Sequence, residues 1–368
     1  MTDTSVTDTG DWVTDTWVVP DAATAPDTDV YTYPDTSDAS PFKADRALTL
    51  LFGAPDLPGR FVCLGAFAPS ADPTAVDAPA SAVPAAGAYG VPDPSDPTNP
   101  MKTTAFQYGA VVPFPLTAEM IAALKVFKVV VYLLDENPAK SSRSCASMWK
   151  TVKDDTKRWK TFDPSTIKAG EHALLSMIGC VNGAPAGDTT GTCGPAGNFE
   201  LRLDKLDVAK PTSPSDATIG LQFLHLSQFA GTSVVPGWNT ASGVDVYVAT
   251  VAGTTSFFKI ANAVKFKDIA PQTVGVRLPA GATKDNSFLI VAATGTPPCI
   301  NSGPPTTACP SYTLPLSPFL DPATGYPRVG GGLFPNTTQV VALIGSPVAS
   351  ATLTRSMRIA FARATAWP

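Results

Sequence analysis

The first residues to consider are those that could perform acid–base or nucleophilic chemistry. A serine hydrolase of the Gly-x-Ser-x-Gly type is not indicated, because the sequence lacks that motif and has only two histidines, His172 and His225. Both histidines lie in apolar, strand-like patterns, which is typical of hydrogen-bonded structural residues. A metal site would have to be built mainly from carboxylates, because each half of the chain contains one histidine. We therefore predict no catalytic residue, no metal site and no cofactor.

Paired carboxylates could cleave a glycosidic bond if two of them reached one sugar. The candidates are Glu119, Asp135, Glu136, Glu171 and Glu200. Nothing in their spacing brings two of them together, so a hydrolase is only the third functional hypothesis. Phosphate-binding loops are not indicated either, because no G-x-G-x-x-G or Gly-Lys-Ser/Thr loop follows a predicted strand.

Two aromatic residues could bind a ligand. Trp238 lies in a loop that contains Pro236 and Gly237, and Tyr247 lies on the polar face of a predicted strand. Together they could form a platform for a sugar or a peptide. The alternative is that Trp238 covers the end of the hydrophobic core. A carbohydrate- or peptide-binding module is therefore the second functional hypothesis.

The cysteines favour disulfide bonds over a zinc site, because no CxxC motif or zinc-type cysteine–histidine spacing occurs. Cys180 and Cys193 flank one loop rich in Gly, Thr and Pro, and Cys299 and Cys309 flank another. We expect each pair to close its own loop, which would contribute roughly 3 kcal/mol in the chain-entropy description.

The remaining pair, Cys63 with Cys145, then follows by elimination. Six buried and reduced thiols are the alternative. Disulfides favour an oxidising compartment outside the cytoplasm, so we expect the protein in the periplasm, on the outer-membrane surface or secreted.

Short strands must position these residues. Proline makes up 37 of 368 residues, about twice the usual ~5%, which argues against a helical bundle, and 44% hydrophobic residues exclude wholesale disorder. The clearest period-two alternations are Asn198–Asp204, Val244–Val248, Val274–Leu278 and Met357–Phe361. Such strands, separated by Pro/Gly turns without helices between them, predict an all-β fold of antiparallel β-sandwiches.

One proline-free segment, residues 144–160, departs from the strand pattern. Its apolar residues lie near helical spacing: Cys145, Met148, Trp149, Val152 and Trp159. We predict one amphipathic helix inserted in the first half, covering an edge or end of a sheet. A basic helix on a membrane surface is the alternative, which Asp154 and Asp155 weaken.

An internal repeat divides the chain into two halves. The matched segments are Ala47–Ala54 with Gly220–Ser227, Ala173–Gly179 with Gln339–Gly345, and Phe199–Leu203 with Met357–Phe361, at offsets of 173, 166 and 158 residues. We expect two β-sandwich domains, residues 45–210 and 216–368, joined near Lys210–Ser215. One continuous sheet is the alternative.

Residues 1–44 precede these domains. Residues 1–40 contain nine Asp and no Lys, Arg or Glu, so we predict a disordered Asp/Thr-rich tether. A calcium-binding Asp repeat is disfavoured, because the glycine and terminal glutamate of an EF-type loop are absent. Leaders of this kind resemble the tethers after the lipidated cysteine of bacterial surface lipoproteins. We expect an export signal upstream of Met1, and this resemblance implies a lipid anchor there as well.

Charge and hydropathy exclude two partner classes. The chain beyond residue 40 balances 26 basic against 22 acidic residues without a basic aromatic cluster, so no nucleic-acid partner is expected. No transmembrane segment is predicted, because no run approaches the ~20 apolar residues needed to span a bilayer.

Four motifs in one order resemble the family called domain of unknown function 4397. They are Phe223–Ser227 with its histidine, the Val-Asp-Val-Tyr-Val run Val244–Val248, the Leu-Pro-Ala-Gly turn Leu278–Gly281, and Val341–Gly345. In the first half Phe52 replaces the histidine. The resemblance implies tandem immunoglobulin-like β-sandwiches, secreted or anchored to the bacterial envelope, with no catalytic residues to transfer.

The leading functional hypothesis combines these observations. We expect a non-catalytic bacterial cell-envelope or secreted protein, acting as a surface-tethered structural or adhesive module. Its partner would be an unidentified protein or glycan at the cell surface.

Overall fold

The computed structural model shows a protein built mostly of β-strands, as the sequence predicts. The structure describes residues 47–54, 56–84, 87–91, 95–96, 98–99, 101–115, 127–167, 172–181, 197–206, 218–227, 243–252, 254–270, 273–277, 287–300, 306–315, 338–344 and 358–363. The predicted tether, residues 1–44, lies outside these ranges. Among the described residues, no helix has both the length and the apolar character needed to cross a membrane.

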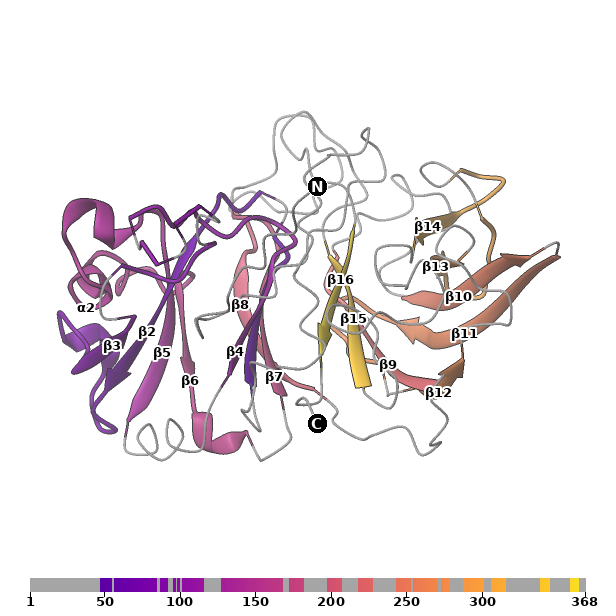
Figure 1. Ribbon diagram of the computed structural model, residues 1–368. Helices are drawn as coiled ribbons and strands as arrows, with labels where there is room; N and C mark the ends of the chain where they lie inside the picture. The colour runs from indigo at the N-terminus through magenta and orange to yellow at the C-terminus, as the bar shows by residue number, and fades with distance from the viewer. Residues whose placement is uncertain are drawn as a thin grey trace.

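The first half of the chain forms two four-stranded sheets (Figure 1). We call β3-β2-β5-β6 the first outer sheet and β4-β1-β7-β8 the first inner sheet. Their strands are β1 (Ala47–Phe52), β2 (Phe61–Phe67), β3 (Ser81–Val83), β4 (Val111–Pro115), β5 (Lys128–Leu134), β6 (Trp159–Phe162), β7 (His172–Ile178) and β8 (Glu200–Lys205). Short 3-10 helices lie between them: η1 (Pro73–Ala75), η2 (Pro138–Ser141), η3 (Trp149–Thr151) and η4 (Pro164–Thr166).

The second half repeats this arrangement strand for strand. The second inner sheet has the order β12-β9-β15-β16 and the second outer sheet the order β11-β10-β13-β14. Their strands are β9 (Thr218–His225), β10 (Val244–Ala252), β11 (Thr254–Val264), β12 (Thr273–Arg277), β13 (Ser287–Ala293), β14 (Ser311–Pro315), β15 (Thr338–Ile344) and β16 (Arg358–Arg363). The described strands thus form four separate sheets, and the alternative of one continuous sheet is wrong.

The sequence repeat also relates the strand registers. The prediction of antiparallel sandwiches is wrong for one strand pair in each inner sheet: in the first, β1 runs parallel to β7, with Ala47 opposite His172. In the second inner sheet β9 runs parallel to β15, with Gly220 opposite Thr338. The offsets of 173 and 166 residues read from the sequence convert the first pair into the second.

The closing strands follow the same rule. Ala173 of β7 lies opposite Lys205 of β8, and Gln339 of β15 lies opposite Arg363 of β16, both in antiparallel pairs. Offsets of 166 and 158 residues convert one pair into the other. The differences in length between the halves therefore lie in loops, and the two inner sheets share strand order and register.

The core of the first half lies between its two sheets. Its members alternate along each strand, because successive side chains of a strand point to opposite faces. They include Leu48, Leu50 and Phe52 of β1, Ala173, Leu175 and Met177 of β7, and Val129, Val131 and Leu133 of β5.

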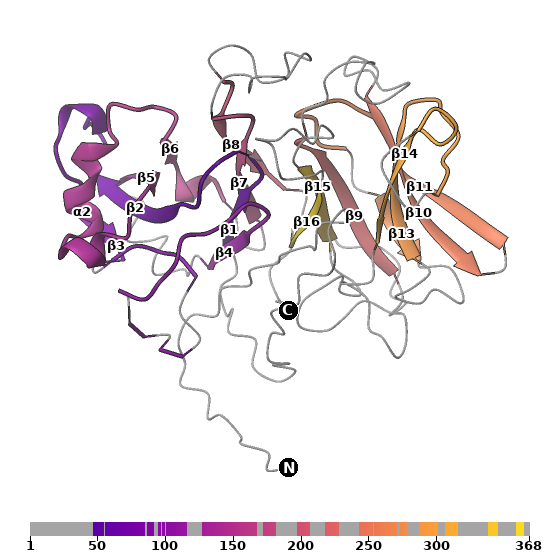
Figure 2. The ribbon, with the colours of Figure 1, turned by 90° about the horizontal axis from the view of Figure 1, so that it is seen from above.

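A second apolar layer, which we call the inter-half layer, joins the two inner sheets. Its strand members are Leu51, Val111, Leu174, Ile178, Leu224, Ala342 and Ile344. In β1 and β7 these residues alternate with residues of the first core, so both strands are buried on both faces. This explains why β1 and β7 are almost continuously apolar. Figures 1 and 2 accordingly show four layers with the two inner sheets facing each other.

The helix predicted over residues 144–160 is shorter in the structure. The α-helix α2 spans Cys145–Met148 and continues only as the 3-10 turn η3. Ser144 begins α2 through a capping box with Ser147. The later residues of the predicted helix form turns and then strand β6.

Asp155 keeps the helix from continuing through residues 155–158. Its side chain accepts a hydrogen bond from the Lys157 N–H at 3.1 Å, and its carbonyl accepts one from the Arg158 N–H at 2.9 Å. Such side-chain-to-backbone bonds offer the chain a turn in place of a helix. Trp159 therefore reaches the apolar residues near α2 from a strand, where it lies opposite Tyr132 of β5.

The helical segment also covers a different surface from the one predicted. It packs on the outer face of the first outer sheet rather than on an edge or end (Figure 2). Trp149 is fully buried there, and its indole N–H donates to the carbonyl of Pro73 at 3.0 Å. Its ring contacts Phe67, Tyr132 and Trp159 at centroid distances of 5.1, 5.3 and 5.6 Å.

Candidate functional site

The carboxylates considered for glycoside cleavage do not converge. Glu119 and Glu171 lie outside the described residues. Asp135 forms ion pairs with Arg60 and Arg158, Glu136 pairs with Arg143 at 3.6 Å, and Glu200 pairs with Lys267 at 2.8 Å. Within the described ranges no group of three or more His, Cys, Asp or Glu residues is placed to hold a metal ion.

The histidines occupy strands. His172 begins β7, and His225 ends β9. His225 is only 1% exposed, and its ring lies near those of Phe223 and Phe266 at centroid distances of 6.5 and 6.1 Å. Burial lowers its pKa to about 3, so the imidazole is neutral at physiological pH. The surroundings of His225 are those of a structural core residue.

Of the two residues predicted to bind a ligand, the structure describes one. Trp238 lies outside the described residues, whereas Tyr247 is half-buried in the middle of β10. The ammonium of Lys259 lies over its ring, 5.2 Å from the centroid, and the Phe257 ring packs edge-on at 6.4 Å. Lys259 lies opposite Tyr247 in the antiparallel pair of β10 and β11. One part of the predicted aromatic surface is therefore occupied by neighbours from β11.

Asp245, two residues earlier in β10, fixes these neighbours. Its side chain is 2% exposed and accepts hydrogen bonds from Lys259 Nζ at 2.7 Å and from the N–H groups of Ala263 and Gly295 at 2.9 and 3.3 Å. Burial by itself would raise the pKa of Asp245, but these donors outweigh it and the pKa is lowered. The hydrogen bond to Asp245 in turn raises the pKa of Lys259.

The Asp245 interactions also hold an irregular part of the sheet. The register of β10 with β11 shifts between Val244 and Tyr247, and Ala263 has a φ of 51°. A non-glycine residue rarely adopts a positive φ without local support, which here comes from the carboxylate that accepts the Ala263 N–H. Beyond Tyr247, toward the turn, the register is regular.

The regular part of this hairpin, Val248–Ala252 of β10 with Thr254–Lys259 of β11, is the candidate functional site, which we call the β10–β11 arm. Figures 1 and 2 show the tip of this hairpin, beyond the last pair of β10 with β13 at Thr250, extending past the other strands of the second outer sheet. Every residue from Thr254 to Lys259 is exposed. Val251, Phe257 and Phe258 expose 39%, 39% and 44% of their surface, which makes them three of the five exposed large apolar residues among those described.

The sequence interpretation did not single out Phe257 or Phe258. The signal was present, because two consecutive phenylalanines in a strand must point to opposite faces. Phe257 lies opposite Ala249 on the face that carries Tyr247, and Phe258 lies opposite Val248 on the other face. Val248, Ala249 and Thr250 of β10 are buried, whereas the β11 side of the arm presents one exposed phenylalanine on each face, where it can contact a partner.

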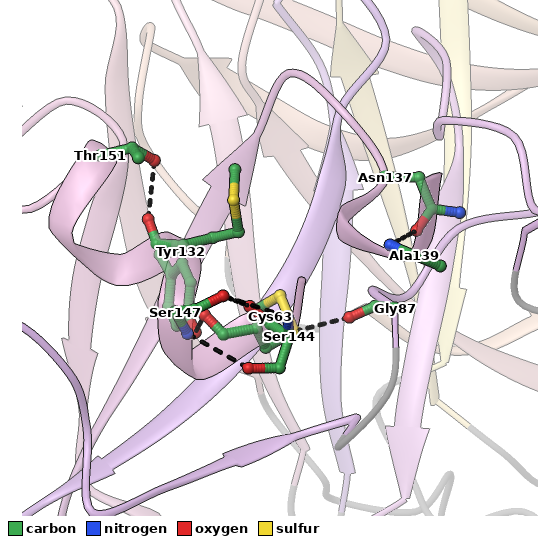
Figure 3. Close-up of a disulfide and its surroundings, with 10 residues drawn as sticks. Cys63, Gly87, Tyr132, Asn137, Ala139, Ser144, Ser147 and Thr151 are labelled. Carbon is green, nitrogen blue, oxygen red and sulfur yellow. Dashed lines mark hydrogen bonds between the residues drawn. A yellow bond between two sulfur atoms is a disulfide. The ribbon is translucent and has the colours of Figure 1, made fainter. Parts of the chain in front are cut away.

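Each half of the chain contains a described disulfide bond. Cys63 of β2 is bonded to Cys145 at the start of α2, across 82 residues, with a Cα–Cα distance of 5.7 Å (Figure 3). Both cysteines are fully buried, and the Tyr132 hydroxyl donates to the carbonyl of Cys145 at 2.7 Å. This bond ties α2 to the sheet that it covers, and the pair is the one reached by elimination from the sequence.

The loop disulfides are described in part. Cys299 and Cys309 are bonded across 10 residues, also with a Cα–Cα distance of 5.7 Å. Cys180 is disulfide-bonded as well, whereas Cys193, its predicted partner, lies outside the described residues. Among the described cysteines none is a free thiol.

Comparison with known proteins gives little further information. No family model and no curated protein matches the chain. Among solved structures, a fimbrial assembly protein from Parabacteroides distasonis aligns with 86% of this chain and 94% of its own, at 8% identity and a TM-score of 0.17. A similarity of this size carries no argument about fold or function.

Proposed function

We propose that the protein is a non-catalytic, extracytoplasmic protein of the bacterial envelope or a secreted one, which serves as a structural or adhesive module. In this proposal residues 45–210 and 216–368 are tandem immunoglobulin-like β-sandwiches, and residues 1–44 are a tether that follows an upstream lipid anchor. The ordered motifs on β9, β10 and β15 that resemble domain of unknown function 4397 support the same assignment.

The location outside the cytoplasm is supported mainly by the disulfide bonds in both halves of this mostly-β fold. Disulfides are rare in the reducing cytosol and persist in the periplasm or outside the cell. The Cys63–Cys145 bond is enclosed by the apolar residues that α2 covers, and the Cys299–Cys309 bond closes a loop next to β14. A cytosolic protein would gain little from cysteines placed at bonding distance in both halves.

The adhesive role is supported by the β10–β11 arm. Its exposed aromatic residues, Phe257 and Phe258, are held by a hairpin whose base is fixed by the Asp245–Lys259 ion pair. Aromatic side chains on a rigid element lose little conformational entropy on contact, which suits them to protein or glycan surfaces. Of the candidate acid–base groups that the structure describes, Asp135, Glu136 and Glu200 form ion pairs and His225 lies in the core.

Thiol trapping in the producing organism tests the compartment. Cells are lysed in an alkylating reagent, and the cysteine-containing peptides are mapped without reduction. We expect no alkylated cysteine before reduction and a cross-linked peptide that joins Cys63 to Cys145. Recovery of six alkylated cysteines from the native protein would show that it resides in a reducing compartment.

Bead attachment tests the adhesive role separately. Beads coated with the full chain should bind to intact cells of the producing species, and beads coated with the Phe257→Ser/Phe258→Ser variant should bind several-fold less. The Val83→Ser/Met101→Ser variant is the matched control, because it removes two exposed apolar residues of the first half. Equal attachment of all three preparations would contradict a role of the β10–β11 arm in adhesion.

The second candidate is a carbohydrate- or peptide-binding module at Tyr247. The Lys259 ammonium and the Tyr247 hydroxyl give this position polar groups beside an aromatic ring. A glycan or peptide array probed with wild type, Tyr247→Ala and Trp238→Ala tests it. Loss of a bound ligand in either variant would favour this candidate, and an unchanged profile would dismiss the two residues as its site.

A further inference from the structure

The strand β11 forms an unusual sheet edge. Of the eight edge strands in the described sheets, the other seven are three to six residues long, whereas β11 has eleven residues. An edge strand directs the backbone N–H and C=O groups of every other residue away from its sheet, so a long regular edge is a template for another strand. Natural proteins block such edges with charges, prolines, bulges or short strands.

The other edges carry these protections. Proline occurs in β4 (Pro113, Pro115) and β14 (Pro315), charged residues occur in β6 (Lys160), β8 (Glu200, Arg202, Asp204, Lys205), β12 (Arg277) and β16 (Arg358, Arg363), and β3 has only three residues. In β11 the segment Thr254–Phe258 has neither proline nor charge. The register shifts of this hairpin lie at its base, between Val244 and Tyr247.

The one charged residue in the exposed part of β11 does not protect its edge. Lys259 donates to Asp245 and Asn262 and lies over the Tyr247 ring, so its ammonium is directed back across β10. The ion pair with Asp245 also neutralises the positive charge of Lys259, which is the charge nearest to the exposed edge. No described strand pairs with this edge of β11.

We propose that β11 pairs, antiparallel, with β11 of a second copy of this chain, about a two-fold axis through Ser256. The inference goes beyond the function proposed above and does not rest on it. A second copy fits this edge because the segment Thr254–Phe258 is complementary to itself, as its register shows.

The faces of the strand restrict the register. A two-fold axis perpendicular to a continuous sheet keeps each face of the sheet on its own side. One residue of the central strand must then lie directly opposite its own copy, and the axis passes midway between the two. An axis through Ser256 places Thr255 opposite the second copy's Phe257, and Thr254 opposite its Phe258. Pairs of an aromatic with a β-branched residue are among the favourable cross-strand neighbours. An axis through Phe257 or Phe258 would instead set Lys259 opposite Thr255 or Phe257.

The pairing about Ser256 also avoids contacts between like charges and gives a closed dimer. Lys259 lies beyond the five residues that pair on each strand, so no like charges face each other. The result is one eight-stranded sheet, in which each second outer sheet contributes β14, β13, β10 and β11. Both exposed edges are consumed, so the assembly stops at a dimer.

Sedimentation velocity and native mass spectrometry of the full chain, from low to high micromolar concentration, test the proposal. We expect a concentration-dependent dimer for the wild type. Ser256→Lys and Ser256→Glu each place like charges at the two-fold axis, and each should weaken the dimer at least about tenfold. An equimolar mixture of the two variants should restore a dimer that contains one copy of each.

Thr161→Lys on β6 is the matched control, because it places a lysine at an exposed position of another edge strand. It should leave the dimer unchanged. A wild type that is monomeric at every concentration, a dimer that survives Ser256→Lys, or a mixture without the mixed dimer would each overturn the proposal. Open-ended aggregates in place of a dimer would also overturn it, because the two-fold pairing closes.

Discussion

Two buried ionisable residues of the second half illustrate opposite solutions to burial. Asp245 stays charged because a lysine and two backbone N–H groups donate to it, whereas His225 stays neutral among phenylalanine rings. Burying a charge without partners costs far more than burying a neutral ring. The surroundings of each residue therefore determine its protonation state, which is charged for Asp245 and neutral for His225.

The neutral state of His225 makes stability depend on pH. The pKa of the imidazole falls from 6.5 to about 3 on folding, so below pH 6.5 the unfolded chain binds a proton that the native chain does not. The free energy of unfolding should therefore fall as the pH decreases below 6.5, by up to about 1.4 kcal/mol per pH unit. Urea unfolding at pH 7.5, 6.5 and 5.5 measures this slope above the range in which the carboxylates titrate.

Two variants separate titration from packing. His225→Gln should lower stability at pH 7.5 but reduce the slope between pH 6.5 and 5.5. Phe223→Leu, which changes the packing beside the imidazole, should keep the wild-type slope. If His225→Gln and wild type lost stability in parallel on acidification, the buried imidazole would not be its cause.

Among the elements, α2 is the one whose position depends most on a covalent bond. It has only four residues and is followed by a single 3-10 turn, so hydrogen bonds within it contribute little. Its place on the first outer sheet depends on the buried Trp149 and on the Cys63–Cys145 bond. The strands below it, in contrast, pair over their whole length.

The two described disulfides should differ in their contribution to stability. In the chain-entropy description, a bond across 82 residues contributes about 4.5 kcal/mol and a bond across 10 residues about 2.7 kcal/mol. Cys63→Ala/Cys145→Ala should therefore lose more stability in urea unfolding than Cys299→Ala/Cys309→Ala. It should also shift the fluorescence of Trp149 to the red. Equal losses, or a larger loss for the loop pair, would contradict this assignment.

The sequence predicts the elements best where local pattern and long-range packing agree. The alternation of Val244, Val246 and Val248 predicts β10, and the repeat offsets relate the register of one inner sheet to that of the other. The last residues of the predicted helix were assigned wrongly because Asp155 forms a turn that hydrophobic spacing does not report. Strand β6 was missed with it.

The candidate site was predicted only in part, because it depends on contacts between strands that are distant in sequence. The alternation places Asp245 on a polar face, but the structure buries it. Its partners Lys259 and Ala263 come from the neighbouring strand, and Gly295 follows β13. The exposure of Phe257 and Phe258 depends on the position of β11 at the edge of its sheet, which no periodicity within the strand encodes.

For the whole molecule, the inter-half layer is the feature that the sequence did not predict. The sequence predicts two domains joined near Lys210–Ser215, with no apolar layer shared between them. Instead Leu174 and Ile178 of one half pack with Leu224 and Ile344 of the other. Apolar contact over the central strands argues for two halves held as one unit.

Neighbouring leucines of β7 test this coupling. Leu174 faces the inter-half layer and Leu175 faces the first core, and both are buried. Leu174→Ala and Leu175→Ala should each cost about 2–5 kcal/mol in the first half. Only Leu174→Ala should also reduce the hydrogen-exchange protection of β9 and β15. Equal loss of protection in these strands for both variants would mean that the halves are not coupled through this layer.

The parallel pairing inside each inner sheet sets when the chain can fold. β1 pairs with β7, and β9 with β15, in each case across more than a hundred residues. Contacts so distant in sequence form slowly, because a long segment must be confined before they contribute. Neither half can complete its inner sheet until its last two strands have left the ribosome. Under the extracytoplasmic location proposed above, we therefore expect the nascent polypeptide to stay unfolded enough to pass through an export channel, and to form its disulfides and inner sheets only after export.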